Sequence, residues 1–123
     1  MATILVADDS AVNRLVCTHI LHEADHQVLT AEDGLEAWLS LQQNEVHLLV
    51  SDIAMPEVDG FTLLRRIRAN HELKELPVIL LTGIGETEEQ LALMAGNANR
   101  IMSKPVSSWE LADSVNSLLE QTQ

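Results

Sequence analysis

The sequence predicts a doubly wound α/β fold, in which helices cover both faces of a parallel sheet. Three observations predict it: five short apolar runs, segments of helical periodicity between them, and turn residues at the junctions. Strands that alternate with helices of this length form parallel sheets, because each helix crosses the sheet before the next strand begins. With 123 residues, 46% of them hydrophobic, the chain is long enough for one domain over residues 1–123.

The first half of the chain contains three predicted strands. Thr3–Ala7 is the first, and apolar positions from Val12 to Ile20 then recur at helical spacing. Val28–Ala31 is the second strand, followed by a helix that begins near Gly34. Val46–Ser51 is a continuous apolar run, which is typical of a strand covered on both faces.

The second half continues the alternation after a turn-rich stretch, residues 54–60. In order, the predicted elements are a helix marked by Phe61, Leu64 and Ile67, a strand over Pro77–Thr82, an acidic helix over Glu86–Ala95, a strand over Arg100–Ser103, and a helix marked by Leu111, Val115 and Leu118. The chain therefore contains five β/α units.

This order of elements predicts a flavodoxin-like sheet of five parallel strands, with strand order 2-1-3-4-5 and five helices. In such sheets ligands bind outside the carboxyl ends of the strands, where the strand order reverses between the first and third strands. Asp8 and Asp9 follow the first predicted strand, and Asp52 follows the third. We therefore expect these carboxylates to lie together.

The composition excludes several classes of function. A formal net charge of −12 would repel a nucleic-acid backbone and offers no basic stripe for anionic lipid, so we expect neither partner. No apolar run is long enough for a membrane span. The single cysteine, Cys17, cannot form an internal disulfide and fits a reducing compartment, so we expect a soluble, cytoplasmic protein.

The three aspartates predict a magnesium site. Neighbouring carboxylates repel one another unless a cation compensates them. Mg²⁺ prefers oxygen ligands and often takes one or two carboxylates together with a phosphate oxygen, which suits Asp8, Asp9 and Asp52. The backbone carbonyl of Ala54, in the loop after the third strand, could add another ligand.

Two further polar residues suit phosphoryl transfer. A carboxylate such as Asp52 is a recognised nucleophile for this reaction, which mainly needs in-line positioning and neutralisation of charge. Thr82 ends the fourth predicted strand, and Lys104 follows the fifth. Their hydroxyl and ammonium groups could bind phosphoryl oxygens.

These positions together resemble the receiver domains of bacterial two-component response regulators, of the chemotaxis-regulator type. The resemblance spans essentially the whole chain, and any one of its motifs alone would mean little. The motifs that carry it are Asp8-Asp9, the Asp52-Ile-Ala-Met-Pro-Glu-Val-Asp-Gly60 segment, Thr82 and Lys104-Pro105.

The resemblance implies a signalling switch rather than an enzyme. A histidine kinase or phosphotransfer protein would donate a phosphoryl group to Asp52, and Thr82 and Lys104 would bind that group. Asp9, Asp52 and the Ala54 carbonyl would hold Mg²⁺, with Asp8 assisting. The modified domain would change its binding to a downstream protein or output domain, and homodimers through the fourth and fifth elements are a further family expectation.

The sequence departs from the family pattern at two places. Ile101 stands where an aromatic residue often precedes the lysine by three positions, and Gly83 stands where alanine often follows the threonine. The family's aromatic switch is therefore not expected to operate in its usual form. The glycine also predicts a mobile loop after the fourth strand.

Other hypotheses remain open on the sequence alone. A magnesium-dependent phosphohydrolase of the haloacid-dehalogenase type would also use Asp52, but it normally carries a second aspartate where this chain has Ala54. A receiver that binds partners without phosphorylation is another alternative. His19, His22 and His26 fall at helical spacing, yet histidines near a helix end are usually surface residues, so we assign no metal to them.

Overall fold

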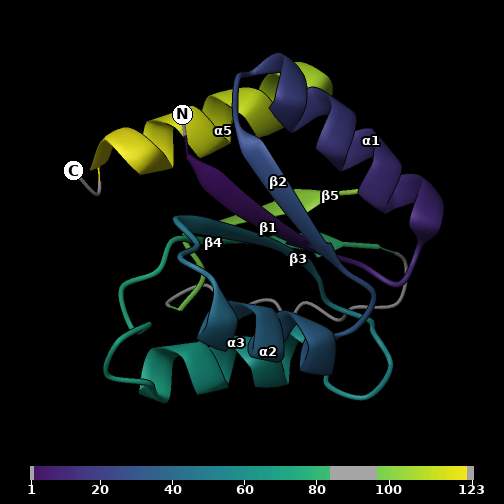
Figure 1. The fold of residues 1–123 in the computed structure, drawn as a ribbon. Helices are drawn as coiled ribbons and strands as arrows, with labels where there is room; N and C mark the ends of the chain where they lie inside the picture. Colours follow the sequence, from purple (N-terminus) through teal and green to yellow (C-terminus); the bar gives the residue numbers. More distant parts are fainter. Residues whose placement is uncertain (1, 84–96, 122–123) are drawn as a thin grey trace.

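The computed structural model describes residues 2–83 and 97–121, which form a sheet covered by helices (Figure 1). The strands are β1 (Thr3–Ala7), β2 (Gln27–Ala31), β3 (Leu48–Asp52), β4 (Val78–Thr82) and β5 (Arg100–Ser103). The helices are α1 (Ala11–Glu23), α2 (Gly34–Gln43), α3 (Gly60–Ala69) and α5 (Ser108–Gln121). None of these helices combines the length and apolar content that a membrane span requires.

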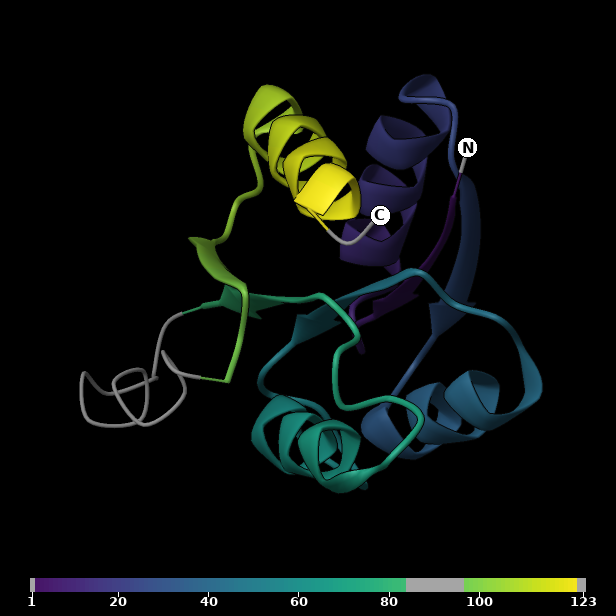
Figure 2. The ribbon, with the colours of Figure 1, turned by 90° about the vertical axis from the view of Figure 1, so that its left-hand side faces the viewer.

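All five strands are parallel and lie in the order β2-β1-β3-β4-β5, which confirms the predicted sheet. Helices α1 and α5 cover one face, and α2 and α3 cover the other (Figure 2). The chain crosses from one side of β1 to the other between β2 and β3, so the strand order reverses between β1 and β3. This is the edge at which the sequence places its acidic residues.

The described residues contain fewer helices than the predicted five. The described residues form four helices, α1, α2, α3 and α5. The predicted acidic helix over Glu86–Ala95 lies outside the described residues.

Alternation along the strands builds a core on each face of the sheet. In β1, Leu5 and Ala7 pack on the face covered by α2 and α3, whereas Ile4 and Val6 pack under α1 and α5. All five residues of β3 are buried, as the continuous apolar run predicts. The strand extends one residue further than predicted, so that Asp52 is its last residue.

Side-chain caps begin the helices near the carboxyl edge of the sheet. The Ser10 hydroxyl accepts from the backbone N–H of Asn13 at 3.2 Å, and the Asp59 carboxylate accepts from that of Thr62 at 2.8 Å. Such caps satisfy N–H groups that the first turn leaves without a partner. The first turn of α1 is thereby fixed directly after Asp8 and Asp9.

The loop after β3 folds back against the strand end. The backbone N–H of Gly60 donates to the carbonyl of Ile53 at 2.8 Å. A Cβ on Gly60 would lie 2.5 Å from the carbonyl oxygen of Asp52, so only glycine allows this close approach. Glu57 within the loop has a positive φ of 67°. The loop thus holds the backbone at Asp52 in place.

Candidate functional site

Three strand ends bring the central charged groups together. Asp8 directly follows β1, Asp52 ends β3, and Lys104 directly follows β5. The ammonium nitrogen of Lys104 lies 3.1 Å from Oδ2 of Asp8 and 3.1 Å from Oδ1 of Asp52. Asp8 is 0% exposed and Asp52 4% exposed, so one cation compensates two buried carboxylates.

Asp9 completes an acidic group that fits a divalent cation. Asp8, Asp9 and Asp52 each offer one carboxylate oxygen, and these atoms lie within 4.8 Å of one another. Asp9 is exposed, which leaves the group open on one side. A set of hard oxygen donors with room for water suits Mg²⁺. Ala54, whose carbonyl the sequence analysis adds to this group, is an exposed residue in the loop that follows β3.

The Asp8 carboxylate is held by its own chain as well as by Lys104. Its Oδ1 accepts from the backbone N–H of Ser10 at 2.9 Å, and its Oδ2 accepts from the side-chain amide of Asn13. Arg14 donates to the Asp8 carbonyl at 2.7 Å and lies 3.6 Å from Glu32. These contacts explain how an aspartate can be wholly buried at this position.

Burial and the neighbouring charges shift the proton affinities of two groups. Burial raises the pKa of Asp52 and the charge of Asp8 raises it further, while the hydrogen bonds from Lys104 and the Ile53 N–H oppose this rise. For Lys104, burial lowers the pKa, but pairing with Asp8 and Asp52 outweighs burial, and the pKa is raised overall. Lys104 therefore stays an ammonium ion at neutral pH.

Thr82 lies at the same edge but contacts a different group. Its hydroxyl donates to the carbonyl of Met102 in β5 at 3.4 Å, a long hydrogen bond. The structure therefore places Thr82 near Lys104 at the strand ends without engaging it with Asp8 or Asp52.

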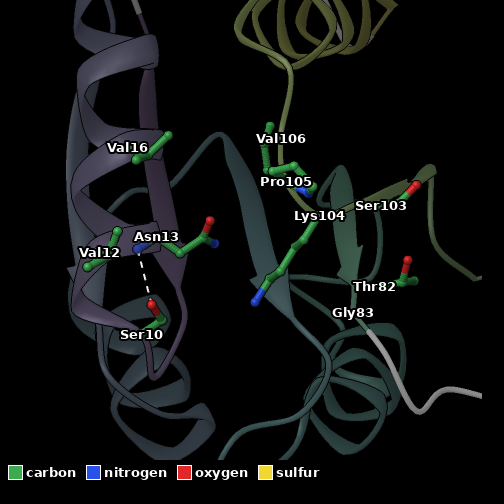
Figure 3. Close-up of a pocket in the computed structure, with 10 residues that line it drawn as sticks. All are labelled: Ser10, Val12, Asn13, Val16, Thr82, Gly83, Ser103, Lys104, Pro105 and Val106. Carbon is green, nitrogen blue, oxygen red and sulfur yellow. Dashed lines mark hydrogen bonds between the residues drawn. The ribbon is translucent and has the colours of Figure 1, made fainter.

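A cavity of about 630 Å³ opens beside the charged groups (Figure 3). The side chain of Lys104 extends along it, with α1 on one side and the ends of β4 and β5 on the other. The residues that line it are Ser10, Val12, Asn13, Val16, Thr82, Gly83, Ser103, Lys104, Pro105 and Val106. The cavity therefore gives access to the Lys104 side chain.

Sequence reasoning missed the contact of Asn13 with Asp8. The side chain of Asn13 reaches back from α1 to the acidic group. A usable signal was present, since an amide in the first turn after a strand-end aspartate pair lies within reach of that pair.

Ile101 and His26 both contact neighbouring parts of the fold. Ile101, at the position where relatives often carry an aromatic residue, is partly buried against the core on the α2 and α3 face. His26 lies within hydrogen-bonding distance of the side-chain oxygen Oδ1 of Asn116 through Nε2, at 2.7 Å, and accepts the Ala2 N–H at Nδ1. This histidine links the N-terminal segment to α5 by hydrogen bonds.

Comparison with known proteins identifies the family. The model of the response regulator receiver domain matches residues 4–116. Chemotaxis protein CheY1 of Helicobacter pylori is 32% identical over 118 residues, which cover 94% of this chain and 95% of that protein. The two-component response regulator ORR3 of rice (Oryza sativa subsp. indica) is 36% identical over 105 residues, which cover 84% of this chain and 79% of the relative.

A solved structure agrees with these sequence relatives. The signal receiver domain of a signal transduction histidine kinase from Syntrophus aciditrophicus superposes with a TM-score of 0.92 at 31% identity, covering 100% of this chain and 93% of the other. Since the family model matches residues 4–116 and a solved receiver domain superposes on the whole chain, this chain belongs to the receiver domain family of two-component response regulators.

Proposed function

We propose that residues 1–123 form a single receiver domain in which Asp52 accepts a phosphoryl group in a magnesium-dependent reaction. The donor is a histidine kinase or a phosphotransfer protein, and the modified domain binds a downstream partner or output domain differently. The domain acts as a regulatory switch in a phosphorelay, not as an enzyme that turns over a substrate.

The observation that supports this proposal best is the position of Lys104 between Asp8 and Asp52, at 3.1 Å from each carboxylate. A phosphoryl group on Asp52 brings more negative charge into this site. An ammonium already within reach of Asp52, with acidic ligands for a cation beside it, suits the stabilisation of that charge.

In the proposed reaction, a carboxylate oxygen of Asp52 attacks phosphorus and forms an oxygen–phosphorus bond. The bond from phosphorus to the imidazole nitrogen of phosphohistidine breaks, and its electron pair leaves with that nitrogen. Asp9, Asp52 and the Ala54 carbonyl, assisted by Asp8, would hold Mg²⁺, which supplies positive charge to the phosphoryl oxygens when bound. Asp52 enters the reaction as a carboxylate, so it loses no proton in this step.

Lys104 and Thr82 have separate roles in the product. Lys104 turns from the Asp8 carboxylate toward a phosphoryl oxygen. Thr82 gives up its long hydrogen bond to the Met102 carbonyl and donates to another phosphoryl oxygen. Met102 belongs to β5, so this exchange links the phosphoryl group to the edge strand of the sheet. A partner that binds at this edge would then bind differently.

Position 101 carries isoleucine, so no aromatic ring at this position can move in response to Thr82. Ile101 lies beside Leu80 of β4 in the sheet. We propose that the aliphatic side chain instead repacks against its neighbours on the α2 and α3 face. The cytoplasmic location and the homodimer through the fourth and fifth elements remain predictions of the same account.

Phosphorylation by a small donor tests the proposal without knowledge of the cognate kinase. Incubation with acetyl phosphate and Mg²⁺, followed by intact mass, should show a phosphoryl-sized gain that disappears with chelator. A gain of the same size in Asp52→Ala would contradict the assignment of the acceptor.

A further inference from the structure

The side-chain amide of Asn13 shares an acceptor with the ammonium of Lys104. Both groups donate to Oδ2 of Asp8, while the backbone N–H of Ser10 donates to Oδ1. Asp8 is 0% exposed, so its carboxylate is bound by protein groups and not by bulk water. The hydrogen bonds of this carboxylate therefore depend on these three groups.

The backbone of Asn13 is fixed close to Asp8. Its backbone N–H binds the Ser10 hydroxyl at 3.2 Å in the cap of α1. Figure 3 shows its side chain directed from α1 into the cavity, on the side that faces Lys104. Lys104 reaches the same carboxylate from the far side of the cavity, after β5.

Phosphoryl transfer requires Lys104 to move and Asn13 to stay in place. In the proposed function, Lys104 turns toward the phosphoryl group and so withdraws from Asp8. A buried carboxylate that loses its cation resists this movement unless another donor remains. Asn13 remains, because its amide is anchored to α1 and does not follow Lys104.

We propose that Asn13 is a positioning residue that holds the Asp8 carboxylate and thereby frees Lys104 for the phosphoryl group. This inference rests on the proposed function for the destination of Lys104. Its structural part, that Asn13 weakens the hold of Asp8 on Lys104, concerns the unphosphorylated protein and is measurable there.

A helix-capping role of Asn13 and the proposed role predict opposite changes in the reactivity of Lys104 when Asn13 is replaced. If Asn13 only stabilises the start of α1, its removal loosens the site and exposes Lys104. If Asn13 competes for Asp8, its removal binds Lys104 more tightly. The chain has two lysines, Lys74 and Lys104, so the exposed Lys74 serves as an internal reference.

The experiment measures acetylation of Lys104 by acetic anhydride relative to Lys74 in magnesium-free protein, by peptide mass spectrometry. Asn13→Leu and Asn13→Ala, which remove the donor, should lower the ratio at least about threefold. Asn13→Gln should return it toward the native value, and Leu15→Ala, an exposed position of the same helix outside the cavity lining, should leave it unchanged. A ratio that stays the same or rises in both donor-less variants overturns the inference.

The rate of phosphorylation by acetyl phosphate is the second measurement. Loss of the donor should lower the maximal rate about tenfold with little change in the half-saturating concentration, and Asn13→Gln should restore most of the rate. If native protein accepts no phosphoryl group, the proposed function fails, while the acetylation ratio still decides the role of Asn13. A donor-less variant that keeps the native maximal rate contradicts the inference.

Discussion

The ammonium nitrogen of Lys104 lies 3.1 Å from Oδ1 of Asp52, and the chain brings them together from the ends of β5 and β3. This pair is not simply stabilising, because Lys104 is also bound to Asp8 and both carboxylates are buried. A single positive charge compensates two negative ones. The site can therefore accept a further cation. The stability of the fold should depend on which of these charged groups are present.

Removal of the Lys104 charge should destabilise the fold strongly. Lys104→Met leaves Asp8 and Asp52 buried without their cation, and we expect a loss of about 3 kcal/mol in the free energy of unfolding. Urea denaturation in chelator measures it. Added Mg²⁺ should recover part of the loss in this variant, and a Lys74→Met control should lose little. Equal stability of the two variants would contradict the role of the pair.

Removal of the Asp52 charge should have the opposite effect at neutral pH. Because burial raises the pKa of Asp52, the folded state binds its proton more tightly than the unfolded chain does. The resulting stabilisation is present below the unfolded pKa of about 3.9 and is lost as pH rises through the raised folded pKa. Ionised Asp52 therefore destabilises the folded protein at pH 7.

In metal-free buffer, Asp52→Asn should accordingly melt at a higher temperature than native protein at pH 7. The difference should shrink as pH falls and Asp52 in the native protein takes up its proton. Asp113→Asn, on the exposed side of α5, is the matched control and should show no such dependence. A lower melting temperature for Asp52→Asn at pH 7 would mean that the pair with Lys104 outweighs the cost of burial.

Cys17 should be unreactive in the folded protein. It is 0% exposed, and burial, followed by the charge of Asp8, raises the pKa of its thiol to about 11. At pH 8 the thiolate fraction should be about a hundredfold below that of an ordinary thiol, since each pKa unit is a factor of ten. Alkylation by iodoacetamide, followed by mass with and without urea, measures the protection. Rapid labelling without urea would contradict the burial.

The loop after β3 should tolerate no side chain at Gly60. Gly60→Ala places a Cβ 2.5 Å from the Asp52 carbonyl oxygen, and the resulting backbone shift should cost about 1–3 kcal/mol of stability. It should also slow phosphorylation by displacing Asp52. Gly83→Ala is the control for stability, because a Cβ there meets nothing within 4 Å. Similar losses of melting temperature in both variants would argue against this role of the loop.

The sequence predicted the convergence of Asp8, Asp9, Asp52 and Lys104 because parallel strands bring their carboxyl ends to one edge. That inference needs only the order of elements and the position of each residue after its strand. The contact of Thr82 with Met102, and that of Asn13 with Asp8, depend on side-chain rotamers and on the cap of α1. Periodicity carries no information about such rotamers, so these contacts required the structure.

Intact mass after incubation with acetyl phosphate tests the central claim most directly. Four samples are needed: native protein with Mg²⁺, native protein with chelator, and Asp52→Ala and Asp9→Ala with Mg²⁺. We predict a phosphoryl-sized gain in native protein with Mg²⁺, none in chelator or in Asp52→Ala, and a slower gain in Asp9→Ala. No gain in native protein with Mg²⁺, or an equal gain in Asp52→Ala, would contradict the account of Asp52 as the phosphoacceptor.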